Sequence, residues 1–336
     1  MEKLLTIGIT SYNRVNELKR CLESIETKFP EKIEVLVSED KSPMKKEIEA
    51  LVSEYAKKVL FQVRFHSNEH NLGYDRNLKK ILELAEGQYV FYISDDDTLY
   101  PYAIDKTIRV LEKENHSMIY APFYLEGGKE LRRTYDKSYV IKSDPQYAAK
   151  HVFDSILFSG LVFRRDQVID LDAEPFLNKN YFQVYMFLYC ISKWGGYYMC
   201  KPTVRAMADG ENAYGYSDSS EKNELLADRT SVFSNLEFHK GLIFVIKKFD
   251  EDYQMNIFRG FEKEYNLRSI VGMSNAEACG KKVLKKYWRK MNSLDIRMNV
   301  ISRVYYMMLM LFGKKLTLSI LSIPKRILLR NRHEVQ

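Results

Sequence analysis

Apolar runs of strand length alternate with segments of helical periodicity over the first 120 residues, and this alternation limits the fold more than any other feature of the chain. The runs are residues 4–10, 33–38, 61–65 and 89–94, and the helical segments are residues 17–25, 48–55, 78–84 and 104–111. Strands and helices in alternation favour a parallel sheet with helices on both faces. In such a sheet, ligands bind at the carboxyl ends of the strands.

The pattern loses its regularity after Ser117. Residues 155–163 predict a strand that returns to the sheet, residues 181–192 predict a helix, and residues 197–200 predict another extended segment. From Glu221 onward the pattern is mainly helical. We therefore expect the second half of the chain to complete the sheet and then to become helical.

Small and polar residues at 214–220 mark a boundary between an α/β domain over residues 1–215 and a helical region over residues 216–336. Residues 279–333 hold 14 Lys or Arg and one acid, Asp295, so this stretch carries +13 and the remainder carries −6 of the net +7. A mildly acidic body with a basic tail differs from the uniform basic surface of a nucleic-acid-binding protein. We expect no nucleic-acid partner.

The cysteines and the N-terminal sequence predict a reduced, cytoplasmic protein. Cys21, Cys190, Cys200 and Cys279 are far apart and form no C-x-x-C pair, so neither a disulfide framework nor a cysteine metal site is expected. Residues 1–7 lack the long apolar core and the small-residue cleavage site of a signal peptide.

Three consecutive carboxylates, Asp95-Asp96-Asp97, follow the apolar run 89–94. Adjacent like charges repel, and a cation lowers the cost of holding them together. Oxygen ligands of this kind suit Mg²⁺ or Mn²⁺, which also neutralise phosphate groups. The alternative is a solvated acidic turn before a helix that begins near Pro101. The triplet alone does not decide between a metal site and such a turn.

Polar segments follow each of the four predicted strands, at residues 10–14, 38–42, 71–77 and 94–97. Each segment alone is an ordinary turn sequence, because Asn, Asp, Ser and Gly favour turns for local backbone reasons. Because the carboxyl ends of parallel strands lie at one edge of a sheet, a single ligand can touch all four segments.

In this order and spacing, the chain resembles the family 2 glycosyltransferases of the GT-A fold. The resemblance rests on Thr-Ile-Gly-Ile-Thr-Ser-Tyr-Asn-Arg at 6–14, Glu-Asp-Lys-Ser at 39–42, Asn-Leu-Gly at 71–73, Arg-Asn at 76–77 and the triplet at 95–97. It extends over residues 4–215 and is most specific over residues 4–112. It implies a mixed, mainly parallel sheet flanked by helices.

The resemblance implies an inverting transfer, assisted by Mn²⁺ or Mg²⁺, of a sugar from a nucleotide-sugar donor to an acceptor hydroxyl. Residues 1–115 would bind the donor, with a UDP-sugar favoured, and residues 116–215 would bind the acceptor. The implied acceptor is a glycan or a lipid-linked oligosaccharide in the synthesis of a surface polysaccharide.

Roles for single side chains in the donor pocket also follow from the resemblance. Thr10, Tyr12 and Arg14 would line the nucleotide pocket, with the Tyr12 ring against the base. Asp40, or its neighbour Glu39, would accept a hydrogen bond from the base or the ribose.

Arg76 would stabilise the pyrophosphate or the base, and the Asp triplet would hold the donor and its metal. Asp95 and Asp97 would point the same way along an extended segment, because side chains alternate along it. Asp95 and Asp96 would contact the donor. The direct metal ligand would be Asp97, in preference to Asp95. The metal would stabilise the negative charge that grows on the departing nucleoside diphosphate.

Two positions depart from the family pattern. The second motif usually reads two aspartates followed by Gly-Ser, whereas here it reads Glu-Asp-Lys-Ser. The helix that corresponds to residues 181–192 usually opens with an acidic dipeptide that supplies the general base. Gln183 stands near that place, and Gln cannot take a proton from an attacking hydroxyl. The nearby carboxylates are Asp154, Asp172, Glu174 and Asp209, and we favour Asp209 as the base.

Two other functions are alternatives to sugar transfer. A nucleotidyltransferase would normally carry a Gly-rich phosphate loop near its N-terminus, but residues 10–14 contain no glycine. A degenerate relative would bind a sugar nucleotide, or scaffold a glycan-assembly complex, without catalysis. Gln183 keeps this second alternative open.

Residues 300–331 form a basic and apolar tail. Its longest apolar run, 304–312, has nine residues, whereas a helix needs about 20 apolar residues to cross the hydrocarbon core. Helices with apolar and basic faces lie in the interface of anionic membranes instead. We therefore predict peripheral contact with the inner face of the cell membrane. The alternative is a helical cap that packs on the body or on a second subunit of a homo-oligomer.

Overall fold

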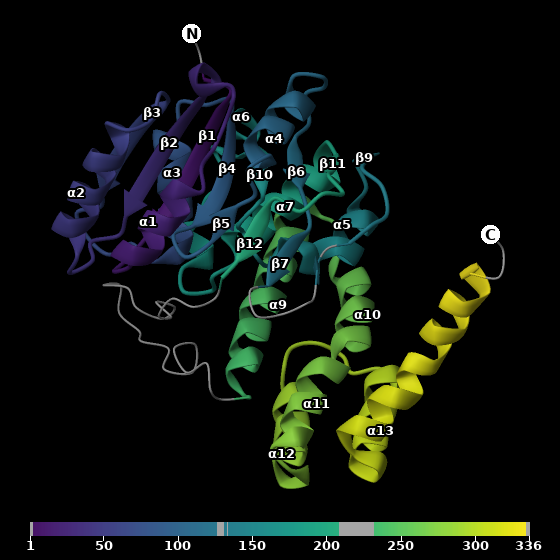
Figure 1. Ribbon diagram of the computed structural model, residues 1–336. Helices are drawn as coiled ribbons and strands as arrows, with labels where there is room; N and C mark the ends of the chain where they lie inside the picture. Colours follow the sequence, from purple (N-terminus) through teal and green to yellow (C-terminus); the bar gives the residue numbers. More distant parts are fainter. Residues whose placement is uncertain (1–2, 126–130, 133, 208–231, 334–336) are drawn as a thin grey trace.

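The computed structural model describes residues 3–125, 131–132, 134–207 and 232–333. A large sheet forms the upper part of the molecule in Figure 1, and helices of the C-terminal region form a lower lobe. The predicted boundary at 214–220 and the favoured base Asp209 lie outside the described residues.

The main sheet has eight strands, which are β1 (Leu5–Ser11), β2 (Ile33–Glu39), β3 (Gln62–Ser67), β4 (Tyr89–Ser94), β6 (Met118–Tyr120), β9 (Tyr139–Ile141), β10 (Val162–Arg164) and β11 (Gly196–Tyr198). Their order is β3-β2-β1-β4-β10-β6-β11-β9. The first four are parallel to one another, β10 is antiparallel to both neighbours, and β9 is antiparallel to β11. The predicted mixed, mainly parallel sheet is confirmed.

Helices cover both faces of this sheet (Figure 1). One face packs against α1 (Val15–Glu23), α2 (Lys45–Ala56) and α4 (Ala103–Leu111). The other packs against α3 (Tyr74–Leu84), α5 (Pro145–His151) and α7 (Phe182–Lys193). A short helix, α6 (Arg165–Val168), follows β10. The positions of α1 to α4 confirm the helical segments predicted from residue spacing.

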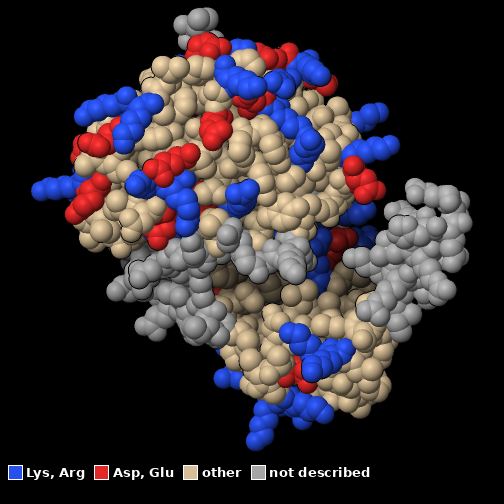
Figure 2. Space-filling view, viewed as in Figure 1, with Lys and Arg blue, Asp and Glu red and all other residues tan. Residues whose placement is uncertain are grey.

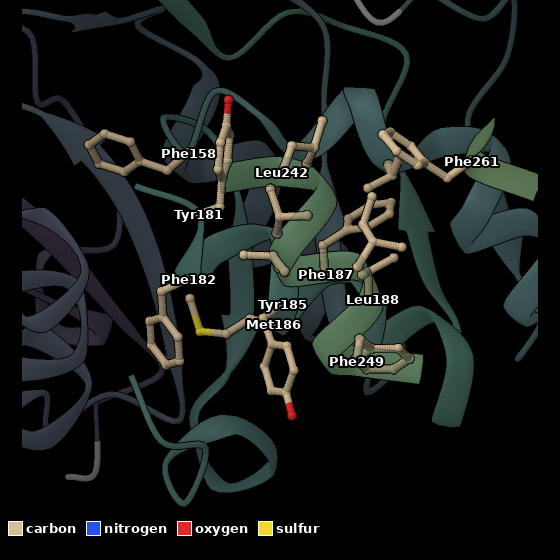
Figure 3. Close-up of a cluster of buried hydrophobic side chains, with 14 of the residues drawn as sticks. Phe158, Tyr181, Phe182, Tyr185, Met186, Phe187, Leu188, Leu242, Phe249 and Phe261 are labelled. Carbon is tan, nitrogen blue, oxygen red and sulfur yellow. The ribbon is translucent and has the colours of Figure 1, made fainter. Parts of the chain in front are cut away.

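Helix α7 forms the centre of the larger hydrophobic core because it is apolar on every side. Ten of its twelve residues are buried, including Phe182, Met186 and Phe187. Figure 3 shows side chains of α7 in one cluster with Leu242 and Phe249 of α9 (Ser234–Tyr253). A helix that is apolar all round is stable only when other elements surround it.

A second, smaller sheet lies beside the carboxyl edge of the main one. Its order is β5-β12-β7-β8, formed by β5 (Thr98–Leu99), β12 (Val204–Ala206), β7 (Phe123–Leu125) and β8 (Leu131–Arg132). Since β5 directly follows the Asp triplet, its pairing with β12 holds the segment that ends at Met207 next to that triplet.

The predicted strand over residues 155–163 is wrong in most of its length. A short 3-10 helix, Val152–Ser155, opens this stretch, and only Val162–Arg164 pairs in the sheet. Gly160 has φ +86, a left-handed conformation that interrupts an extended chain. Before it, Phe158 packs in the core without forming a ladder, whereas Ile156 is exposed.

In the described C-terminal part of the chain, α9 is followed by the helices α10 (Phe258–Arg268), α11 (Ile270–Ala278), α12 (Lys281–Asn292) and α13 (Val300–His333). Gly313 divides α13, since its φ of 72 and ψ of 174 are not helical. Residues Val300–Ser322 have the length and apolar composition of a membrane-crossing helix, with a mean hydropathy of 1.3, and 11% of the apolar window is buried. The prediction of peripheral membrane contact rests on the uninterrupted apolar run 304–312, which is shorter than this helix.

Candidate active site

The four polar segments meet at one edge of the sheet, as predicted. The strand register places Thr10 opposite both Ser38 and Ser94, and Glu39 opposite Ser67. The carboxyl ends of β1 to β4 are therefore level with one another. The loops that follow these strands form the candidate donor site.

The Asp95–Asp97 segment is a turn, and the expected extended conformation is wrong. The Asp97 N–H donates to the Ser94 carbonyl oxygen at 3.1 Å, and the Asp95 N–H donates to the Thr10 carbonyl oxygen at 3.2 Å. Because the chain turns here, the two outer carboxylates point to different neighbours. Asp95 contacts the loop after β1, and Asp97 contacts the end of β12.

The loop after β1 binds both oxygens of Asp95. The Tyr12 N–H donates to Oδ2 at 3.0 Å, and Arg14 Nη1 donates to Oδ1 at 2.9 Å. The same Arg14 nitrogen lies 3.3 Å from Asp96 Oδ2. Burial raises the pKa of Asp95 to about 6, although Arg14 acts in the opposite direction. These contacts bring three of the predicted donor-site residues together around one buried carboxylate.

Asp97 is held from the other side. Its Oδ1 accepts the Met207 N–H at 3.1 Å, and the Ser159 hydroxyl also bonds to its carboxylate. Burial, and then repulsion from Asp96, raise the pKa of Asp97 to about 7. The Ser159 hydroxyl oxygen also accepts the Ser94 N–H at 3.0 Å. Sequence reasoning missed Ser159, because nothing in its local pattern separates it from an ordinary loop serine.

The residues of this turn fit a divalent cation. All three carboxylates are buried, and the raised pKa of Asp97 indicates that its charge is poorly balanced by the protein. Their oxygens are the hard ligands that Mg²⁺ and Mn²⁺ prefer. No cluster of three or more His, Cys, Asp or Glu side chains suited to a metal occurs within the described part of the chain. A cation here would need oxygens from a bound diphosphate as well.

Asp40 holds the loop between β3 and α3. Its carboxylate accepts hydrogen bonds from Asn68 Nδ2 at 2.8 Å, from the Leu72 N–H at 2.8 Å and from the Gly73 N–H at 2.9 Å. Burial raises the pKa of Asp40 to about 6. A carboxylate can accept about four hydrogen bonds, so Asp40 can accept one further hydrogen bond from a nucleotide.

Glu39 organises the loop after β2. It accepts the Lys41 N–H at 3.1 Å and the Ser67 hydroxyl at 2.9 Å, and it also accepts the Ser42 N–H. Lys41 has a left-handed φ of 58 at the place where the family motif has glycine. The departure from the family pattern at Lys41 therefore keeps the loop conformation that a glycine favours.

Arg76 lies in the first turn of α3, directly after the loop that follows β3. Its guanidinium forms a two-bonded ion pair with Glu174, with Nε–Oε1 at 2.7 Å and Nη2–Oε2 at 2.5 Å. The pair is partly exposed, and exposed pairs contribute about 0–1 kcal/mol. The predicted contact of Arg76 with the donor requires this pair to open, at a small cost.

Asp75 binds the amino end of α7 and was not predicted. It accepts the backbone N–H groups of Asn180 at 3.0 Å and of Tyr181 and Phe182 at 2.9 Å. Burial raises the pKa of Asp75 to about 7 against these hydrogen bonds. Gln183 follows in the first turn of α7, where it donates from Nε2 to the Ile156 carbonyl oxygen at 2.9 Å.

Three of the four base candidates are bonded within the fold. Asp154 accepts from the Tyr135 hydroxyl at 2.8 Å and pairs with His151 at 3.0 Å, while Asp172 accepts the Glu174 N–H at 2.9 Å. Glu174 is the partner of Arg76. The fourth candidate, Asp209, follows Met207 by two residues and lies outside the described chain.

Comparison with known proteins identifies one family. The model of "Glycosyl transferase family 2" matches residues 6–170. An uncharacterized glycosyltransferase of Methanocaldococcus jannaschii is 25% identical over 151 residues, which are 44% of this chain and 51% of that protein. The abequosyltransferase RfbV of Salmonella typhimurium is 24% identical over 233 residues, which are 62% of this chain and 68% of that protein. The chain spans about half the length of the first of these relatives.

Solved structures share the fold at low sequence identity. S. aureus TarS residues 1–349, in complex with UDP-GlcNAc, has a TM-score of 0.55 and 12% identity, with 91% of each chain covered. GalNAc-T7, with UDP, GalNAc and Mn²⁺, has a TM-score of 0.52 and 16% identity, covering 80% of this chain and 57% of that one. These likenesses establish the GT-A fold.

Proposed function

Because the chain belongs to glycosyl transferase family 2, we propose that it transfers a sugar, with inversion, from a nucleotide-sugar to a hydroxyl of a glycan or lipid-linked oligosaccharide. A UDP-sugar is the favoured donor, and the reaction is metal-dependent. The setting we propose is the synthesis of a surface polysaccharide. RfbV, an abequosyltransferase, is a relative with this kind of activity.

One observation carries the proposal. Buried carboxylates at the end of β4 bond to Arg14 and to the Tyr12 backbone on one side and to the Met207 backbone on the other. Negative charge is therefore concentrated where the loops of four parallel strands converge. This arrangement suits a diphosphate bridged by a cation.

Each side chain of the site has a separate role in donor binding. Thr10, near the end of β1, and Tyr12, in the loop after it, are half-buried, so the Tyr12 ring can pack against a base. Asp40 accepts from the base or the ribose, and Asp97 supplies the metal ligand. Asp95 keeps Arg14 and Tyr12 in place. A bound Mg²⁺ or Mn²⁺ would stabilise charge on the departing diphosphate.

The acceptor oxygen would bond to the anomeric carbon while the bond from that carbon to the diphosphate oxygen breaks. The hydroxyl proton then requires a base. We assign it to Asp209, because the other three nearby carboxylates already hold partners in the fold. Met207 places the chain beside the Asp triplet two residues before this carboxylate.

A second candidate function is donor binding without transfer. It is favoured by Gln183, whose Oε1 is buried without a hydrogen-bond partner among the described residues, near the place where the family pattern has its base. A protein of this kind would bind a sugar nucleotide or scaffold a glycan-assembly complex. Turnover separates the two functions, because only the enzyme converts the donor.

Asp97→Ala tests the metal assignment. We expect wild type to gain thermal stability with a UDP-sugar and Mn²⁺ together, since ligands that bind only the folded state stabilise it. Asp97→Ala should lose the Mn²⁺-dependent part of this gain and the turnover of donor. The variant should fold, because it removes one of three adjacent buried carboxylates and so relieves repulsion.

Asp172→Ala is the matched control, because Asp172 is a carboxylate of the same protein outside the triplet. It should keep both the thermal gain and the turnover. Replacing UDP-sugars by GDP-, dTDP- and CDP-sugars in the same measurement ranks the donors. Unchanged turnover in Asp97→Ala would contradict the metal assignment, and donor binding without turnover in wild type would favour the second function.

A further inference from the structure

A groove of about 810 Å³ runs along α4, outside the donor site. It begins at Pro101 and Tyr102, four residues after the Asp turn, and reaches His116 and Tyr197 at its other end. Its volume lies within the range of about 300–1,000 Å³ found for ligand pockets. None of the donor-site residues lines it. The groove is therefore a separate feature of the molecule.

The groove is lined by more cations than anions. Five Lys or Arg side chains face three acidic ones, which gives the lining a net charge of +2. One of the acids, Asp105, is already occupied, because it accepts the Thr27 hydroxyl at 2.8 Å and the Lys28 N–H at 3.0 Å. Figure 2 shows several Lys and Arg side chains, with acidic ones among them, in the upper part of the view.

Lys106 and Lys201 are the central pair of these cations. Lys106 is half-buried on α4, and Lys201 follows β11. Burial lowers the pKa of the Lys106 ammonium, and the neighbouring Lys201 ammonium lowers it further. Because the lining carries more Lys and Arg than Asp and Glu, an anion that enters the groove would be stabilised by its net positive charge.

Aromatic side chains complete the lining. Tyr197 stacks on His116 with ring centroids 4.8 Å apart, and Tyr102 donates its hydroxyl to the Pro202 carbonyl oxygen at 2.9 Å. Fixed rings present an apolar face together with polar atoms. The C–H faces of sugar rings can pack on such surfaces, while acidic groups of the same sugar chain bind the lysines of the groove.

We propose that the groove along α4 is a second binding site that takes an anionic glycan, a sugar chain that carries carboxylate or phosphate groups. The concave shape excludes a bilayer surface. The net charge is too small for a nucleic acid, whose binding depends on several neutralised phosphates. The proposal does not depend on the identity of the donor or on transfer.

Titration of the full chain with hexagalacturonate, followed by calorimetry at low salt, tests the site. Wild type should bind this carboxylated chain more tightly than neutral maltohexaose, and the difference should shrink as salt screens the charges. Lys106→Gln combined with Lys201→Gln should weaken hexagalacturonate binding by about tenfold, because two charge-assisted contacts are lost.

Lys46→Gln combined with Lys57→Gln is the matched control, since it removes two exposed charges from α2 and its C-cap, on another part of the surface. The control should bind hexagalacturonate like wild type. Both double variants should keep the melting-temperature gain with UDP-sugar and Mn²⁺. The proposal is overturned if wild type fails to prefer hexagalacturonate, if the groove variant retains its affinity, or if a single-stranded oligonucleotide of similar charge binds more tightly.

Discussion

Asp75 is a buried carboxylate that joins α3 to the first turn of α7. It accepts three backbone N–H groups that would otherwise have no partner at the start of a helix. Negative charge is also favourable there because of the helix dipole. Burial nevertheless dominates, since it raises the pKa of Asp75 to about 7. The carboxylate therefore stabilises the structure by its geometry more than by its charge.

The pH dependence of stability follows from this shift. Folding raises the pKa of Asp75 from 3.8 to about 7, so the folded state binds more protons than the unfolded state between these values. The free energy of unfolding should therefore fall as the pH rises through this window, by up to about 1.4 kcal/mol per pH unit from this group. In Asp75→Asn this contribution should vanish, while the amide oxygen still accepts from the helix.

Denaturant unfolding of wild type and Asp75→Asn from pH 4 to pH 8 measures the difference in slope. Asp172→Asn is the control, because Asp172 also accepts a backbone N–H, that of Glu174 at 2.9 Å, but lies in an exposed contact. The control should follow the wild-type slope. Equal slopes in wild type and Asp75→Asn would contradict the assignment.

Residues that act through local motifs could be predicted from the sequence, and residues that act across the fold could not. The polar segments after the first and fourth predicted strands contain Tyr12, Arg14 and Asp95, and these residues contact one another. Ser159 lies outside the four polar segments, and Asp75 lies within residues 71–77 but bonds to backbone groups 105–107 positions away, outside all four segments. Only the packing of β10 and α7 against the sheet brings these partners together.

Among the elements, the parallel half of the sheet was predictable, and the second half was not. The strands and helices up to α4 repeat a regular pattern of apolar residues, so the spacing alone defined them. The strands after β4 have only two or three residues each, which is too short for a periodic pattern to show. The residue spacing of 155–163 resembled a strand because its apolar residues are buried, but Gly160 bends the chain.

Gly241 determines how closely α9 approaches the start of α7. A methyl group at this position would lie 2.7 Å from the Lys179 carbonyl oxygen and 3.2 Å from the Tyr181 ring. Gly241→Ala should therefore destabilise the protein by about 1–3 kcal/mol through overpacking, even though Ala is the better helix former by about 1 kcal/mol. Denaturant unfolding measures the change.

Glu251→Ala provides the comparison on the same helix, because Glu251 is exposed. It should change the free energy of unfolding by no more than about 0.5 kcal/mol. Equal or greater stability in Gly241→Ala would show that α9 can move away from α7 without cost, and would contradict the close packing.

At the scale of the whole molecule, the lower lobe of α11, α12 and α13 differs from the body in its surface. Val300, Val304, Met307 and Leu311 recur at helical spacing on α13, and their side chains are 72%, 44%, 58% and 69% exposed. The opposite face of α13 holds buried Leu309. Large exposed apolar stripes are rare on monomers and mark surfaces that bind a partner or a membrane.

The charge of the neighbouring helix favours a membrane as the occupant. Half of the residues of α12 are Lys or Arg, and this helix packs beside α13 through stacked Trp288 and Tyr306 rings, 4.8 Å apart. Figure 2 shows that the charged side chains on this face of the lower lobe are mostly basic. Each basic residue near an anionic bilayer contributes about 1 kcal/mol. We propose that this lobe holds the protein at the inner face of the cell membrane.

Met307→Glu combined with Leu311→Glu tests the membrane contact without deleting a helix that packs on α11. Wild type should sediment with vesicles that contain phosphatidylglycerol and much less with vesicles of phosphatidylcholine alone. The variant should lose most of this binding, because two carboxylates would enter the apolar region of the interface. Lys46→Gln combined with Lys57→Gln changes the net charge by the same amount elsewhere and should bind like wild type. The alternative is that the apolar stripe is a contact between two copies of the chain. In that case the variant would bind vesicles like wild type but would no longer self-associate.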